Sequence, residues 1–173
     1  MDSLYLSTIA SPLGQLVVAA TPERVYMLEF TVEKRLQRHL KLLEQTFKIV
    51  EGTSPLTEQL KTELEEYFQG ERSVFTVPVQ LTGTDFQQAV WKTIQEVPYG
   101  STRSYSDQAQ QMNQPLAIRA IANANGQNKL AILVPCHRII GVDGSLTGYS
   151  GGKAAKNYLL ELEQGIQQTS LFG

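Results

Sequence analysis

The chain has 173 residues, of which 42% are hydrophobic and 18% charged, enough for one ordinary domain or two small ones with a sizeable core. No stretch approaches the roughly 18 uninterrupted apolar residues of a membrane span, and Met1-Asp2-Ser3 lacks the basic segment of a signal peptide. A single cysteine, Cys136, excludes disulfides and multi-cysteine zinc frameworks. We therefore expect a cytoplasmic protein, nuclear in a eukaryote, with no metal and no membrane partner.

Charge is distributed unevenly along the chain. The net charge of −2 argues against a general nucleic-acid binder, because phosphate contacts require Lys and Arg. From Asp85 to Lys156, however, the chain has seven basic and four acidic residues, against eight basic and thirteen acidic residues elsewhere. This asymmetry favours a DNA-binding face confined to the second half, although a difference this small can also arise by chance.

Alternating apolar residues in the first 30 positions predict a small antiparallel sheet. The alternation runs from Ser3 to Phe30 and is broken by turn sequences at 11–14 and 21–22. Two amphipathic helices follow, the second starting at Ser54-Pro55, and we expect both to cover one face of the sheet. Their apolar positions are Val32, Leu36, Leu40, Leu43 and Phe47 in the first helix, and Leu56, Leu60, Leu64, Tyr67 and Phe68 in the second.

The polar side of the first helix carries a histidine. His39 falls among Lys34, Arg35 and Arg38. We expect a solvated basic surface there, not a ligand site.

A change in pattern marks the boundary between two domains. Residues 70–83 show no sustained periodicity, which predicts one domain over 1–80 and another over 81–173. Thr84 then opens a helix with a capping box, because Gln87 lies three positions later. The apolar side chains of this helix are Phe86, Val90, Trp91 and Ile94, and we expect Trp91 in the core.

Two short helices joined by a tight turn predict a helix-turn-helix, which reads DNA with its second helix. The first starts at Ser104, and the second runs from near Pro115 to Gly126, where glycine suits a left-handed cap. Arg119 on this second helix stands among small side chains, so the helix could approach a duplex closely while the cation reaches into it. The small residues are Ala117, Ala120, Ala122 and Ala124. The alternative is an alanine-rich packed helix with one solvated arginine.

The only cysteine follows a short apolar run. Residues 132–134 predict a buried strand, which Pro135 ends because proline lacks an amide hydrogen. Cys136 would then sit at the strand end beside His137 and Arg138, a base and a cation that favour the nucleophilic thiolate. The alternative is that Cys136 is a small buried hydrophobe.

The last predicted elements are a turn at 142–145 and a helix after Gly151-Gly152. Glu163 falls one turn after Leu159, at the edge of the apolar stripe of this helix. Acidic residues near a helix C-terminus oppose the helix dipole, which favours a special role such as pairing with an imidazole. The alternative is an ordinary exposed charge.

The sequence Pro135-Cys136-His137-Arg138, followed by Ile139-Ile140-Gly141 and by Gly148-Tyr149-Ser150-Gly151-Gly152, resembles the O6-alkylguanine-DNA alkyltransferase family, which repairs alkylated DNA bases. The resemblance covers about the second half of the chain, with further matches at Phe86-Gln87, Val90-Trp91, Pro98-Tyr99-Gly100, Ser104-Tyr105, Arg119-Ala120, Leu159-Leu160 and Glu163. The first half resembles the family only in layout. The resemblance implies an α+β fold, in which a small ribonuclease H-like domain of antiparallel sheet and helices precedes a mostly helical domain with a winged-helix-like helix-turn-helix.

The resemblance also implies a reaction. The alkyl group of O6-alkylguanine would pass irreversibly and once per molecule to Cys136, with the damaged nucleotide flipped out of duplex DNA. O4-alkylthymine is a second candidate substrate. No cofactor is implied, because the group moves directly from oxygen to sulfur. The implied partner is double-stranded DNA containing O6-alkylguanine, bound by a monomer, and cooperative binding along the DNA is left open.

By the same resemblance, His137 acts through a bound water as the base for Cys136, Glu163 holds His137, and Asn128 ties down the loop that carries the cysteine. In hydrolase triads, likewise, a base activates the nucleophile and a third residue holds the base in place. Lys129 stands where the family usually has a proline after this asparagine. The substitution either loosens the loop or adds a phosphate contact.

The remaining implied residues contact DNA or the flipped base. Arg119, with Ala120 beside it, fills the gap left by the flipped nucleotide. Tyr105 helps to turn the phosphate and contacts the base, and the pocket is completed by Tyr149, Ser150 and Lys156, with the Ser150 amide near O6. Ala122-Asn123 replaces a more glycine-rich stretch of the family, which leaves the preference among bulky alkyl groups open.

Two other classes remain possible from the sequence. A cysteine hydrolase could use Cys136, His137 and Glu163. Such an enzyme would catalyse many turnovers and would need an oxyanion hole. It would have no use for the helix-turn-helix or for Arg119. A noncatalytic regulator that binds DNA, including alkylated DNA, could keep Cys136 as a redox sensor or core residue.

Overall fold

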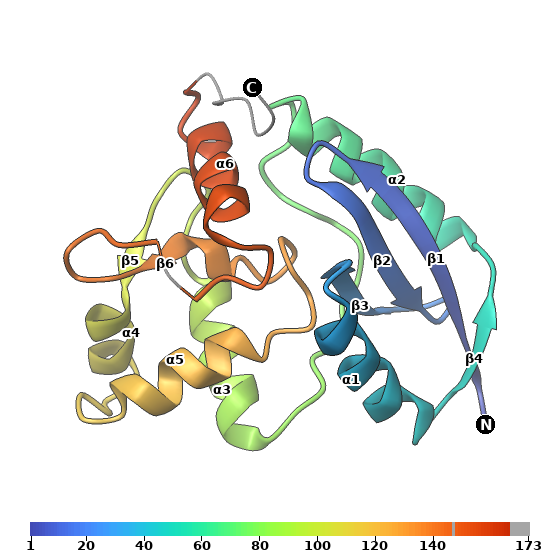
Figure 1. Ribbon diagram of the computed structural model, residues 1–173, viewed down its shortest axis with the longest axis horizontal. Coiled ribbons are helices and arrows are strands. Elements are labelled where there is room, and N and C mark those ends of the chain that lie inside the picture. Colours follow the sequence, from blue (N-terminus) through green and yellow to red (C-terminus); the bar gives the residue numbers. More distant parts are fainter. Residues whose placement is uncertain (147, 167–173) are drawn as a thin grey trace. The chain divides into compact units, whose positions relative to one another are not determined.

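The computed structural model describes residues 1–146 and 148–166 and divides into two compact units (Figure 1). The first unit comprises Met1–Gln80 and Lys129–Leu133, and the second comprises Leu81–Asn128 and the chain from Val134 onward. The sequence-based division placed all of 81–173 in one domain. The segment 129–133 belongs instead to the first unit. It is bound to β3 there, because the Leu28 amide donates to the Lys129 carbonyl (2.8 Å) and the Ala131 amide donates to the Leu28 carbonyl (2.9 Å).

The first unit is built on a four-stranded sheet with the order β3-β2-β1-β4. The predicted antiparallel meander is confirmed: it consists of β1 (Ser3–Ser11), β2 (Gly14–Ala20) and β3 (Val25–Phe30). Gly14 closes the first turn with a φ of +98°, a conformation that glycine adopts without strain. The fourth strand, β4 (Lys48–Glu51), pairs in parallel with β1 and was not predicted. Four residues are too few to show a strand period.

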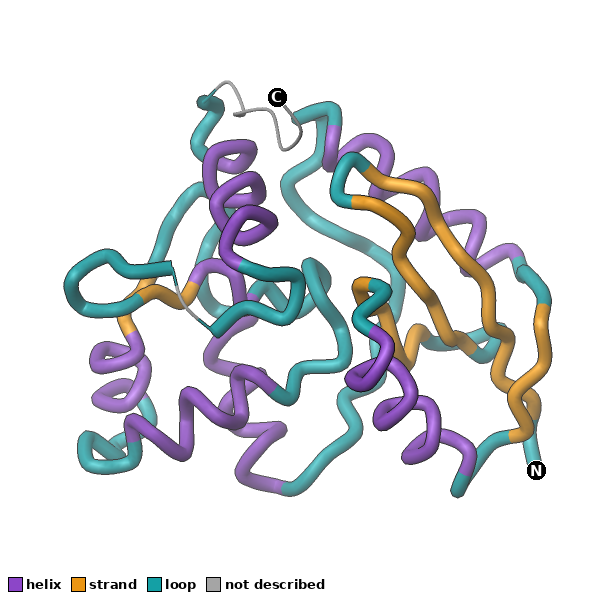
Figure 2. Tube along the Cα trace, viewed as in Figure 1, coloured by secondary structure: helices purple, strands orange, loops and turns teal. Residues whose placement is uncertain are grey.

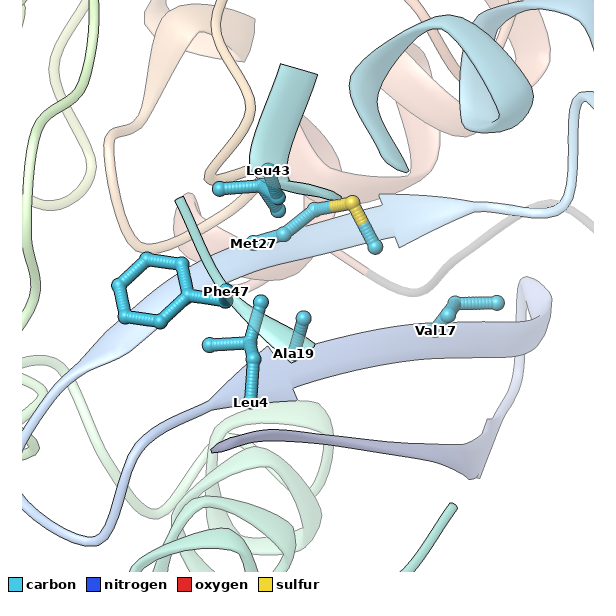
Figure 3. Packing of buried hydrophobic residues seen from close by; sticks show 6 residues of the cluster. All are labelled: Leu4, Val17, Ala19, Met27, Leu43 and Phe47. Atoms are coloured by element: carbon cyan, nitrogen blue, oxygen red, sulfur yellow. The ribbon is translucent and has the colours of Figure 1, made fainter. Parts of the chain in front are cut away.

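Helices cover both faces of this sheet, so the expectation that they share one face is wrong. On one face, α1 (Glu33–Glu44) contributes Leu43 to a cluster that Figure 3 shows from close by. The cluster consists of Leu4, Val17, Ala19, Met27, Leu43 and Phe47. Every residue from Leu16 to Ala20 of β2 is buried, and neighbouring strand residues point to opposite faces. Helix α2 (Pro55–Phe68) contacts β1 and β2 and covers the second face.

A buried charge cluster links β3 to α1, and it corrects the prediction for His39. Glu29 is fully buried, with Arg35 Nε 3.1 Å from Oε2 and His39 Nδ1 2.9 Å from Oε1. His39 follows Leu36 by three residues and precedes Leu43 by four, so a helix brings it to the edge of the apolar stripe. Arg35 therefore neutralises a buried carboxylate that His39 also contacts, and neither side chain is a simple solvated residue.

The second unit is mostly helical (Figure 2) and is organised around one buried indole. Trp91 on α3 (Asp85–Gln95) is buried as predicted, and its Nε1 donates to the Ala124 carbonyl of α5 (Ile118–Gly126) at 2.8 Å. The predicted capping box at the start of α3 is confirmed, with Thr84 and Gln87 each accepting from the other's amide. These local signals position the helix that packs against α5.

Helices α4 (Tyr105–Gln111) and α5 form the predicted helix-turn-helix. A buried amide pair joins them: Gln108 Nε2 donates to Asn125 Oδ1 (3.0 Å), and Asn125 Nδ2 donates to Gln108 Oε1 (2.8 Å). Helix α5 begins three residues later than expected. The left-handed glycine cap is wrong, because Gly126 is helical and the cap is Gln127 with a φ of −91°.

The remaining elements of the second unit carry the cysteine and the last helix. They are β5 (Arg103–Ser104), the 3-10 helix η1 (Cys136–Arg138), β6 (Ile139–Ile140), which is parallel to β5, and α6 (Lys153–Glu163). The predicted turn at 142–145 is confirmed by a hydrogen bond from the Gly141 amide to the Ser145 carbonyl. Among the described residues, no helix has the length and apolar character needed to cross a bilayer.

Candidate active site

The cysteine lies at the start of a 3-10 helix, not at the end of a strand. Residues 132–134 form turns, and Ile132 has a φ of +70°, an uncommon conformation for a β-branched residue. The Cys136 amide donates to the Val134 carbonyl at 2.8 Å. The strand prediction failed because a short apolar run indicates burial without specifying the conformation that is buried. Cys136 is partly exposed, so it is not the fully buried hydrophobe of the alternative reading.

The neighbouring histidine is fully buried and bound to the last helix. His137 Nε2 lies 2.7 Å from Glu163 Oε2, which realises the predicted pairing of this carboxylate with an imidazole. Glu163 also binds Arg138, whose Nε donates to Oε1 (2.7 Å) and whose Nη2 donates to Oε2 (3.1 Å). Arg138 Nη1 donates to the Val97 carbonyl at 2.8 Å. One carboxylate therefore holds two consecutive residues of η1.

The surroundings of His137 and Glu163 favour a neutral imidazole and an ionised carboxylate. Burial lowers the pKa of His137 and outweighs the opposing effect of Glu163. Burial alone would raise the pKa of Glu163, but hydrogen bonds from His137 and Arg138 and the positive charge of Arg138 lower it to about 2. A neutral His137 that donates from Nε2 to an ionised Glu163 keeps the lone pair on Nδ1. Nδ1 is buried and makes no hydrogen bond to any described residue.

Asn128 contacts the sulfur itself. Its Nδ2 donates to the Val134 carbonyl at 2.9 Å and lies 3.3 Å from Cys136 Sγ. A donor at the sulfur favours the charged thiolate over the neutral thiol. Asn128 therefore contacts both the sulfur and the backbone of the loop that carries the cysteine.

Tyr105 and Lys156 lie on the same side of the site. The parallel pairing of β5 with β6 brings Ser104, the N-cap of α4, opposite Ile140. Lys156 Nζ donates to the Ile139 carbonyl at 2.5 Å and lies 5.9 Å from the centre of the Tyr105 ring. Burial raises the pKa of Tyr105 and lowers that of Lys156, and the charge of Cys136 raises both. The pKa values of both groups therefore depend on the charge of Cys136.

The other predicted residues are divided between this centre and the surface. The Tyr149 ring is buried 6.3 Å from the His137 ring and nearly perpendicular to it. Ser150, partly exposed, follows in the turn before α6. Arg119 and Ala120 are exposed in the first turn of α5 and are not part of the centre around Cys136. The Arg119 side chain makes no hydrogen bond or ion pair within 1–146 and 148–166.

Sequence reasoning missed several supporting residues. It placed Arg138 beside the thiolate, whereas the guanidinium is bound to Glu163 and Val97. It had no signal for the Gln108–Asn125 pair, because reciprocal amides are recognisable only once the two helices are placed. Lys129 belongs to the first unit, where burial lowers its pKa and the charge of Glu29 raises it. No group of three His, Cys, Asp or Glu residues in the described chain could hold a metal ion.

A helix-turn-helix next to a partly exposed cysteine and a buried His-Glu pair defines a DNA-binding protein with a reactive cysteine. Two family models match the chain: "6-O-methylguanine DNA methyltransferase, DNA binding domain" over residues 85–165, and its "ribonuclease-like domain" over residues 4–81. The chain belongs to the 6-O-methylguanine DNA methyltransferase family. The expected α+β fold, with a ribonuclease-like first half, is thereby confirmed.

Individual relatives match over nearly the whole chain. The constitutive methylated-DNA–protein-cysteine methyltransferase of Bacillus subtilis is 40% identical over 92% of this chain and 95% of its own length. The Mycobacterium tuberculosis protein of the same name is 41% identical over 93% of both. The crystal structure of M. tuberculosis OGT in complex with DNA has a TM-score of 0.82 and 39% identity, and covers 99% of each chain.

Proposed function

We propose that this protein repairs DNA by transferring the alkyl group of O6-alkylguanine directly and irreversibly to Cys136. The observation that carries the proposal is the buried His137–Glu163 pair, which leaves His137 Nδ1 as an acceptor next to the only cysteine. Membership in the methyltransferase family supports the reaction type. O4-alkylthymine is a second candidate substrate of the same site.

The reaction begins with removal of the thiol proton. His137 Nδ1 accepts it through a bridging water, while Glu163 and Arg138 hold the imidazole in the required tautomer. The amide of Asn128 at 3.3 Å and the positive charge of Lys156 stabilise the resulting thiolate. Each of these interactions favours the charged sulfur before the substrate arrives.

The thiolate then attacks the alkyl carbon. A sulfur–carbon bond forms as the carbon–oxygen bond breaks, and the electron pair of that bond goes to guanine O6. The proton taken from the thiol neutralises the guanine, so the reaction balances without a cofactor. The thioether on Cys136 is stable, which limits each molecule to one turnover.

The alkylated base must leave the duplex to reach Cys136, at a cost of a few kcal/mol. The exposed Arg119 on α5 supports a role in filling the gap, with Ala120 close to the DNA backbone. Tyr105, Tyr149 and Ser150 would form the pocket walls. We expect a monomer to bind each lesion, in the compartment that holds the genome.

Intact mass spectrometry tests this function. The protein is incubated with a duplex containing O6-methylguanine, and we expect one added methyl group on the Cys136 peptide, saturating at one per protein. The Cys136→Ala variant should bind the lesion and remain unmodified. An unmodified wild-type protein with an intact lesion would favour lesion binding alone, and lesion loss without protein modification would favour a turnover enzyme.

A further inference from the structure

Two large apolar side chains come just before Arg119, the cation on the second helix of the helix-turn-helix. Leu116, between α4 and α5, is 100% exposed, and Ile118, the first residue of α5, is 39% exposed. Arg119 follows directly. A single exposed leucine is ordinary, but Leu116, Ile118 and Arg119 lie within four positions at the end of the helix expected to meet DNA.

The charge around this triplet is complementary to a polyanion. No acidic residue occurs in the sequence between Asp107 and Asp143, and the first turn of α5 contains none. Acidic residues are the ones that the helix dipole favours at this position. Their absence leaves the charge of Arg119 uncompensated and favours DNA over a second copy of this chain, whose net charge of −2 is small.

The triplet is presented on a firmly held helix. Ile121, Ala124 and Asn125 of α5 are buried. The Ala124 carbonyl accepts from Trp91 at 2.8 Å, and Asn125 is bonded to Gln108 in both directions. A helix fixed along its buried face loses little freedom when its exposed end binds a partner.

We infer that Leu116 and Ile118 form an apolar wedge that packs against deoxyribose and base edges next to the flipped nucleotide. The inference rests on the proposed function and extends it to particular residues. Apolar side chains separate base steps in this way in several known protein–DNA complexes. The wedge opens the stack that Arg119 enters, so the apolar pair and the cation have separate tasks.

The test compares Leu116→Ser/Ile118→Ser with the wild type and with Leu42→Ser, a control at a 48% exposed leucine on α1 of the first unit. Affinity for a duplex carrying O6-methylguanine is measured at several salt concentrations. Transfer from free O6-benzylguanine reports the intact chemistry. We expect the double variant to bind the duplex about tenfold more weakly, with an unchanged salt slope because no phosphate contact is lost.

Fluorescence of a 2-aminopurine beside the lesion gives a second readout of the wedge. The double variant should lose most of the fluorescence increase that accompanies unstacking, while its reaction with free O6-benzylguanine matches that of the wild type. Equal duplex affinity in the double variant and the wild type, equal losses in Leu42→Ser, or a wild-type dimer that the substitutions dissociate would each overturn the inference. Failure of the wild type to accept an alkyl group from either substrate would instead overturn the proposed function.

Discussion

Replacing Glu163 with glutamine should both slow alkyl transfer and destabilise the second unit. The carboxylate is the shared partner of His137 and Arg138, with contacts of 2.7 Å to each. Glutamine keeps the shape but removes the charge. Because its amide can donate to His137 Nε2, it also favours the tautomer with hydrogen on Nδ1, which cannot act as a base.

The magnitude of the destabilisation follows from the pKa of Glu163. Its value of about 2 in the folded protein, against an ordinary 4.5, corresponds to about 3 kcal/mol of unfolding free energy at neutral pH. Loss of one partner from a buried ion pair costs about 3–5 kcal/mol, in agreement. Loss of a general base slows a reaction by about 10²–10⁴-fold.

Two assays separate these effects. Urea unfolding at pH 7.5 gives the stability, and single-turnover transfer from O6-benzylguanine, at a temperature where the variant is folded, gives the rate. Glu161→Gln, on the same helix but only partly buried, is the matched control and should change the stability by less than about 1 kcal/mol. A Glu163→Gln variant that transfers at the wild-type rate would refute the role of the carboxylate in holding the base.

Three further outcomes follow from the described contacts. The pKa of His137 is lowered by burial, so the rate of transfer from O6-benzylguanine should stay near its plateau as the pH falls to 6.5; a half-maximal rate at or above pH 6.5 would contradict a neutral buried base. Stability should fall as the pH drops from 4.5 towards 2, because Glu163 is protonated first in the unfolded chain; a flat profile of unfolding free energy over this range would count against the ion pair. Glu29→Gln should cost about 3–5 kcal/mol in urea unfolding, because Arg35 and His39 lose their buried partner, and a cost near that of Glu161→Gln would show that the cluster contributes little.

The strand alternation of the first 30 residues and the capping box were predictable from local sequence, whereas contacts between distant segments were not. The capping box of Thr84 and Gln87 was predictable because both partners lie within one helical turn. The parallel pairing of β4 with β1 was not predictable, because it joins short segments far apart in the chain. The buried charge of Glu29 was equally hidden, since alternation places a side chain on a face without revealing what neutralises it there.

The candidate site was also predictable only in part. Cys136 stood out as the only cysteine, and the edge position of Glu163 on its helix suggested a bond to imidazole, which the structure contains. The second task of that carboxylate, holding Arg138, had no sequence signature. The backbone of η1 was also missed, because the apolar residues before Cys136 suit a strand and a buried turn equally well.

The segment 129–133 has a consequence for how such chains can be recombined. It belongs to the first unit, yet it lies between Asn128 and Cys136, which belong to the second. Its attachment to β3 includes main-chain hydrogen bonds at Leu28, and the side chains of Leu28, Leu130 and Ala131 are buried. An insertion of one residue in β3 would shift the register of this attachment and displace the chain that leads to Cys136. Exchange of the first 80 residues between relatives is therefore compatible with function only where the length of β3 is kept.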